Sequence, residues 1–188
     1  MTTEERWVEA GYNLFAHEGP EGLQVERLAR ILNLNKSGFY HYFGDTESYF
    51  KQLKNYHYGK CEHFLKDVAN CQNIDPEYLN ILIKHKVSVL AQVQMVRNQI
   101  HPLLYGAHKE LDEKVGQAIL RIWAEYTELS NNLDLALTYY TIVRDMFYSR
   151  INHENFNYNY LSQLADETRS IVVKIFLEKN SLADKDWM

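Results

Sequence analysis

The sequence predicts an all-α fold of about nine helices, and three observations lead to that prediction. Glycine and proline are scarce, with 8 and 3 residues in a chain of 188. Long stretches that alternate apolar and polar residues, as strands do, are absent. Apolar residues instead recur three and four positions apart, the spacing that gives a helix one apolar face.

The composition is that of an ordinary globular protein, with 46% hydrophobic and 24% charged residues. Cys61 and Cys71 are expected on one helix, roughly 15 Å apart, which is too far for a disulfide. Such cysteines suit a reducing compartment. The acidic first residues do not resemble a signal peptide, and no apolar run approaches the ~18 residues of a membrane span. We therefore expect a cytoplasmic protein without a membrane partner.

The N-terminal region predicts three short helices and the start of a fourth. Their apolar stripes are Trp7, Ala10, Gly11, Leu14 and Phe15, then Val25, Leu28, Ala29 and Leu32, and finally Leu34, Phe39 and Phe43. Gly19 and Pro20 end the first helix, because glycine can adopt a positive φ and proline cannot continue a helix. Asn33, which tolerates left-handed backbone, lies between the second and third helices. Asp45 is expected to cap a fourth helix that ends near Cys71.

The remaining sequence predicts longer helices. Asp75 as N-cap and Pro76 in the first turn begin a helix that ends at about Asn98. A short element or kink is expected at 101–106. Further helices are expected at about 109–129, 133–151 and 158–179.

The second and third helices, joined by a tight turn, form a candidate helix-turn-helix over residues 23–43. In such a motif the first helix supports the second, which enters the major groove of DNA. The sequence here resembles the TetR family of transcriptional regulators. The matching positions are Ala10, Leu14, Phe15, Gly19, Leu28, Ala29, Leu34, the run from Lys36 to Phe43, and the run from Gly44 to Phe50. The resemblance covers about residues 5–55, and beyond them only the number and lengths of the helices agree.

Side-chain chemistry and this resemblance together suggest a set of DNA-binding residues. They are Gln24, Asn35, Lys36, Ser37, Gly38, Tyr40, His41 and Thr46. The lysine can neutralise a phosphate, and the hydroxyl and imidazole groups can reach phosphates or base edges. Gln24 can bind a phosphate beside a helix N-terminus, and the glycine permits close approach to DNA. Phe39, Tyr42 and Phe43 are expected to pack inward. The alternative is that all these residues only hold three small helices together.

Two features of the motif weaken the expected binding to DNA. The family usually has a phosphate-binding lysine where this chain has Thr46, and a glycine where it has Asn33. Residues 1–54 contain six Lys and Arg against eight Asp and Glu, a net charge of −2. We therefore expect a shallow dependence of DNA affinity on salt concentration.

For the C-terminal part, the resemblance implies a homodimer that represses transcription at a palindromic operator and responds to a small apolar or aromatic effector. The expected interface residues on the last two helices are Leu137, Tyr140, Phe147, Leu161, Leu164, Thr168, Ile171 and Ile175. The expected pocket residues are His85, Met95, His101, Tyr105, Trp123 and Tyr126. An ordinary intramolecular core would use the same residues, so both alternatives stay open. We divide the chain into a helix-turn-helix domain, 1–48, and a helical regulatory and dimerisation domain, 49–188.

Other classes of function find less support in the sequence. It has no Gly-x-Ser-x-Gly, glycine-rich phosphate loop or His-Glu-x-x-His, so we expect neither an enzyme nor a cofactor. His57 and Cys61 could share one helix face as metal ligands, but His63 would point elsewhere. The main alternative is a dimeric helical protein that binds a small molecule and has weak or lost DNA binding.

Overall fold

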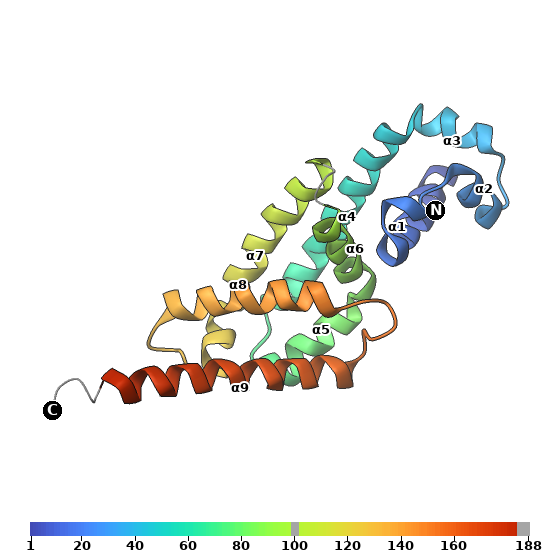
Figure 1. Ribbon diagram of the computed structural model, residues 1–188. Helices are drawn as coiled ribbons and strands as arrows, with labels where there is room; N and C mark the ends of the chain where they lie inside the picture. The colour runs from blue at the N-terminus through green and yellow to red at the C-terminus, as the bar shows by residue number, and fades with distance from the viewer. Residues whose placement is uncertain (99–101, 184–188) are drawn as a thin grey trace.

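The computed structural model describes residues 1–98 and 102–183, apart from the side chains of 102–105, 107 and 175–183. Within these residues, helices are the only regular secondary structure, and loops join them (Figure 1). The α-helices are α1 (Thr3–Glu18), α2 (Val25–Leu32), α3 (Lys36–Phe43), α4 (Thr46–Val68), α5 (Leu79–Lys84), α6 (Lys86–Arg97), α7 (Pro102–Tyr126), α8 (Leu133–Arg150) and α9 (Tyr158–Ala183). Two short turns complete the order, η1 (Pro20–Gly22) before α2 and η2 (Ile74–Tyr78) before α5. The predicted all-α fold is confirmed.

The ends of the first helices follow from local chemistry. Thr2 caps α1, because its hydroxyl accepts from the Glu5 amide at 3.1 Å while the Glu5 carboxylate accepts from the Thr2 amide at 2.7 Å. Gly19 ends α1 with a φ of 71°, and Asn33 ends α2 in the left-handed region with a φ of 53°. Asp45 accepts from the Ser48 amide at 2.7 Å and begins α4, as predicted.

The long helix α4 connects the three N-terminal helices with the rest of the molecule (Figure 1). Helix α1 packs closely on the first turns of α4 at Gly11, where an added Cβ would lie 1.7 Å from the Tyr49 hydroxyl oxygen. Tyr49 uses that hydroxyl to donate to the Trp7 carbonyl at 2.7 Å. Gly11 is therefore required by the close approach of the Tyr49 side chain.

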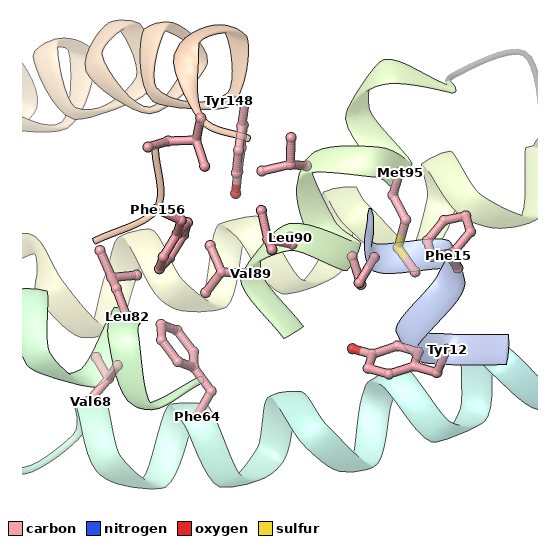
Figure 2. Packing of buried hydrophobic residues seen from close by; sticks show 14 of the residues in the cluster. Tyr12, Phe15, Phe64, Val68, Leu82, Val89, Leu90, Met95, Tyr148 and Phe156 are labelled. Atoms are coloured by element: carbon pink, nitrogen blue, oxygen red, sulfur yellow. The ribbon is translucent and has the colours of Figure 1, made fainter. Parts of the chain in front are cut away.

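A second contact joins α1 to α6. Figure 2 shows Met95 of α6 beside Phe15 of α1, and both side chains are buried at 2% exposure. Figure 2 also shows Phe64 and Val68 projecting from α4 into the same continuous core. The N-terminal helices thus rest on the C-terminal ones through α6 as well as through α4.

Two predicted helix boundaries are wrong. The single helix expected from Pro76 to Asn98 is broken at His85 (φ −101°, ψ 24°), whose imidazole Nε2 lies 2.5 Å from Asp67 of α4. The break redirects the chain, so that α5 contacts α9 while α6 packs on α1. The kink expected at 101–106 is replaced, from Pro102 onward, by the continuous helix α7. Proline is tolerated there because it stands at the first helical position.

Asp75 does not cap a helix as predicted. Asn73 takes that role, and its side chain accepts from the Glu77 amide at 3.0 Å. Asp75 has extended backbone instead, and its carboxylate accepts from the hydroxyls of Tyr158 and Ser162 on α9. The acid therefore ties the segment before α5 to α9.

Helices α8 and α9 lie at the end of the molecule opposite to α3 (Figure 1), with α8 packed on α7. None of the helices, as far as the structure describes them, combines the length and apolar character needed to cross a membrane.

Candidate nucleic-acid interface and internal cavity

Helix α3 is attached to the molecule by two aromatic side chains. Phe39 and Phe43 are 0% and 6% exposed. Phe39 packs edge-to-face on Trp7 of α1 and on Tyr49 of α4, with ring centroids 5.6 Å and 4.9 Å apart. Because the two phenylalanines are four residues apart, they define one inward face, and the opposite face of α3 is left to solvent.

The exposed face of α3 carries Ser37 and His41, which are both exposed. At about 100° per residue, Tyr40 and Tyr42 lie roughly 80° to either side of the inward direction. They are 45% and 41% exposed. The prediction that Tyr42 packs inward is therefore wrong, since it flanks the exposed face as Tyr40 does on the other side.

The N-terminal end of α3 is fixed by Asn35, whose side-chain oxygen accepts from the Ser37 amide at 3.1 Å. This bond satisfies one of the free amides of the first turn. Around Gly38, a Cβ would meet nothing within 4 Å, so packing does not require a glycine at this position.

A shallow depression beside α3 brings in residues of α1. Thr3 and Trp7 line it together with Asn35, Ser37, Gly38, His41 and Tyr42. Thr3 is half-buried in the first turn of α1 and was not predicted as a site residue. No sequence motif marks it, because its place in the site arises from the packing of α1 under α3.

The cation at the start of α3 has an acidic partner. The ammonium of Lys36 forms an ion pair with Glu26 of α2 and lies 5.9 Å from the centroid of the Tyr40 ring. The hydrogen bond from Lys36 lowers the pKa of Glu26, which stays ionised. Elsewhere in the domain, Arg27 pairs with Glu18 and Lys51 with Glu47. The acids therefore do not all face away from the basic groups.

The last two predicted DNA-binding residues also lie at the surface. Gln24 is the exposed N-cap residue of α2 and forms no side-chain capping bond. Thr46 is exposed at the first position of α4. All eight predicted residues are thus exposed or partly exposed, and their contacts with DNA stay predictions.

A second feature of the molecule is an internal cavity of about 140 Å³ among α4 to α9, which is partly open to the surface. Its walls are mostly apolar, and Trp123 is the one predicted pocket residue with a described side chain that lines it. Met95 instead packs on α1, His85 binds Asp67, and Tyr126 donates to Asp166 at 3.1 Å. These three residues have partners away from the cavity. The other two, His101 and the Tyr105 side chain, lie outside the described residues.

Most of the predicted interface residues line this cavity. They are Tyr140, Phe147, Leu161, Leu164 and Thr168, and all but the half-buried phenylalanine are buried. The four buried side chains belong to the core of one protomer, and their place in an interface stays a prediction. Leu137 and Ile171 are 41% and 54% exposed and stay candidates. The Ile175 side chain lies outside the described residues.

A chain of buried polar groups leads from this cavity to α1. Gln92 lines the cavity, and its amide oxygen accepts from His57 Nε2 at 2.9 Å. The other ring nitrogen of His57 then accepts from the Tyr12 hydroxyl at 2.7 Å, because one ring nitrogen of a neutral imidazole carries no proton. The amide nitrogen of Gln92 donates to His108 Nδ1 at 2.8 Å. Four helices, α1, α4, α6 and α7, are joined by these bonds.

The imidazoles of this chain are uncharged at neutral pH. Burial lowers the pKa of both His57 and His108 to about 4. Cys61 Sγ lies 3.4 Å from His57 Nε2, while His63 is exposed. Among the residues that the structure describes, no group of three His, Cys, Asp or Glu is arranged to hold a metal ion.

Comparison with known proteins agrees with the geometry of the N-terminal helices. Residues 8–53 match the family described as bacterial regulatory proteins, tetR family. Searches of curated proteins and of solved structures give no significant match. The N-terminal domain is therefore a TetR-family helix-turn-helix domain, as its sequence predicts. This domain supports a role for the protein in DNA-binding transcriptional regulation.

Proposed function

We propose that the protein is a ligand-responsive transcriptional repressor that binds a palindromic operator as a homodimer. The observation that carries the proposal is the exposed face of α3, which holds Ser37, Tyr40 and His41 clear of the core while Phe39 and Phe43 hold the helix in place. A helix presented in this way fits the width of the major groove.

Homodimerisation would place two such helices on one duplex. Half-sites one helical turn apart require two α3 helices about 34 Å apart, related by a two-fold axis. The exposed Leu137 of α8 and Ile171 of α9 support a contact between the C-terminal regions of two protomers.

Ligand response would use the polar chain from the cavity to α1. A molecule in the cavity that displaces Gln92 would break its bond to His57, and thereby the bond of His57 to Tyr12. Since α1 supports α3 through Trp7 and Phe39, such a change would alter how α3 is held.

The proposal assigns DNA binding to residues 1–48 and regulation and dimerisation to 49–188, in a cytoplasmic protein without enzymatic activity. We call the exposed face of α3, with Ser37, Tyr40 and His41, the reading surface. With this division, the whole of α3 and the start of α4 belong to the domain that carries it.

A gel-shift assay tests the proposal directly. Genomic fragments of the source organism, including the region upstream of its own gene, are incubated with the wild-type chain and with His41→Ala. We expect retention of a specific fragment by the wild type and weakened retention by the variant. The control is His63→Ala, which changes an exposed residue of α4 and should bind as the wild type does. Equal retention of all fragments by all three chains would contradict the proposal.

The ion pair of Lys36 and Glu26 favours one alternative function. With its main cation neutralised, the domain could have lost DNA binding and left a dimeric helical protein that binds a small molecule. In that case the gel shift would show no specific fragment, whereas ligands would still bind to the cavity.

A further inference from the structure

We propose that the internal cavity binds an uncharged aromatic molecule of a single ring that carries one hydrogen-bonding substituent, with phenol as the simplest example. The inference rests on the proposed function for its regulatory meaning, but the binding itself can be measured on the free protein.

The size of the cavity limits the ligand to about one ring. Its volume is about 140 Å³. An apolar protein cavity of ~150 Å³ is large enough to bind benzene. A ligand of two fused rings would have to displace the surrounding side chains, which is costly in a close-packed core, or leave one ring outside the 140 Å³ volume through the partly open side.

The walls of the cavity favour an aromatic or aliphatic body. Phe64, Leu82, Val89 and Ile119 contribute only hydrocarbon surface. The indole nitrogen of Trp123 already donates to the Ala136 carbonyl at 2.9 Å, so its ring offers no free polar atom. Apolar surface of this kind gains free energy when a hydrocarbon replaces water.

Two tyrosines supply the hydrogen bond. Tyr78 and Tyr140 both line the cavity, and neither hydroxyl has a hydrogen bond within the described part of the chain. Tyr140 is only 8% exposed, and burial raises the pKa of both phenols, which therefore keep their protons. A hydroxyl that lines a mostly apolar cavity and has no protein partner favours a ligand oxygen that accepts from it.

The charges at the cavity wall favour an uncharged ligand. Asp112 and Arg144 both line the cavity and form an ion pair with each other. Asp112 also accepts from the Tyr148 hydroxyl at 3.0 Å, and Arg144 binds Asp145 at 2.8 Å. Because these charges already have partners, neither a carboxylate nor an ammonium ligand would find a free counter-charge, and its burial would be costly.

The test measures the binding of three single-ring probes, phenol, toluene and benzoate, and of the two-ring 2-naphthol by isothermal titration calorimetry. We expect saturable binding of phenol and toluene, with phenol bound more tightly. Benzoate and 2-naphthol should bind at least tenfold more weakly than phenol. Tighter binding of benzoate or 2-naphthol, or no saturable binding of phenol, would overturn the inference.

Single-atom variants test the role of the hydroxyls. Tyr78→Phe and Tyr140→Phe each remove one oxygen, and the double variant should lose about fivefold in phenol affinity while toluene affinity stays unchanged. The matched control is Tyr126→Phe, whose hydroxyl binds Asp166 away from the cavity. Unchanged phenol binding by the double variant would also overturn the inference. A chain that binds phenol but no DNA would retain the inference and refute the proposed function.

Discussion

At the scale of single residues, the reading surface is governed by one ion pair. Lys36 is the only lysine on α3, and Glu26 of α2 binds its ammonium group at the surface. For Lys36 to contact a phosphate, it must leave Glu26, and the freed carboxylate would then repel the DNA backbone. This pair therefore lowers affinity twice, through the lost cation and through the added anion.

Replacement of this acid should strengthen DNA binding. Glu26→Gln frees Lys36 and removes one negative charge, so we expect roughly fivefold tighter binding to the operator. The plot of log K against log salt, shallow in the wild type, should become steeper by about one unit. Fluorescence anisotropy at several salt concentrations gives both quantities. Glu62→Gln removes an equal charge far along α4 and is the control. Equal effects of the two variants would refute a local role for the pair.

His57 should make stability depend on pH. Burial lowers its pKa from 6.5 to about 4 in the folded state, so the unfolded chain binds the proton more readily. Stability is thus retained above pH 6.5 and lost as the pH falls toward 4. His57 alone should account for about 2 kcal/mol of unfolding free energy lost between pH 7 and pH 5.

Urea unfolding at the two pH values checks this dependence. His57→Gln should show a smaller loss than the wild type, and His108 contributes a loss of the same sign that stays in the variant. His63→Gln, which changes an exposed histidine of the same helix, should behave as the wild type does. If the loss in His57→Gln equals that of the wild type, the buried histidine is not its source.

Residue types in α3 predicted its inward face only in part. Phe39 and Phe43 were identified by their spacing, and the exposure of Tyr40 and His41 followed from it. Its aromatic ring makes Tyr42 resemble a core residue, but Tyr42 and Tyr40 lie at equal angles on opposite sides of the inward direction, and both are exposed. The angular position of a residue around the helix, which follows from its place in the sequence, predicts exposure in α3 better than residue type does.

At the scale of helices, the contact of α1 with α4 and α6 determines how the reading surface is supported. Tyr49 of α4 reaches over Gly11 to the Trp7 carbonyl, and Trp7 in turn packs on Phe39 of α3. Tyr12, a buried residue of the same helix α1, forms a hydrogen bond with His57 of α4. Helix α1 thus connects the cavity to α3, while α4 also contacts α3 directly through Tyr49 and Phe39.

A methyl group at Gly11 should disturb this support. Gly11→Ala places a Cβ 1.7 Å from the Tyr49 hydroxyl oxygen and must displace the ring. We expect a loss of roughly 1–3 kcal/mol in unfolding free energy, measured by urea denaturation. In Gly59→Ala, a helical glycine with nothing within 4 Å of the new Cβ, stability should rise by about 0.5–1 kcal/mol. A neutral Gly11→Ala would show that this contact is not tight.

The helices that the sequence predicted best are those whose ends depend on local chemistry. The caps at Asp45 and Asn33 are encoded by neighbouring residues, and the structure confirms both. The sequence does not predict the break at His85, whose side chain contacts Asp67, a residue distant in sequence. The role of Asp75 was missed for the same reason, since its partners lie on α9.

At the scale of the whole molecule, the apolar stripes of α8 and α9 serve two purposes that the sequence could not separate. Tyr140, Leu164 and Thr168 face the cavity, whereas Leu137 and Ile171 remain at the surface. Spacing alone identifies an apolar face but not what covers it. The stripes are covered by neighbours distant in sequence: α7 packs on α8, and α5 contacts α9.

Charged residues on the exposed part of these stripes should separate the protomers. In size-exclusion chromatography with light scattering, we expect the wild type to elute as the proposed dimer and the double variant Leu137→Glu/Ile171→Glu to elute as a monomer at the same concentration. Ile142 is 59% exposed and lies roughly 140° around α8 from Leu137, so Ile142→Glu should leave the dimer intact. Dimers in the first variant, or monomers in the second, would refute this interface.

The central claim, that the exposed face of α3 reads duplex DNA, is tested most directly by selection from a random double-stranded library followed by sequencing. We predict that the wild-type chain enriches an inverted repeat with half-sites about one helical turn apart, and that Tyr40→Ala/His41→Ala does not enrich it. The same enriched repeat with that variant, or no enriched sequence with the wild type, would contradict the account.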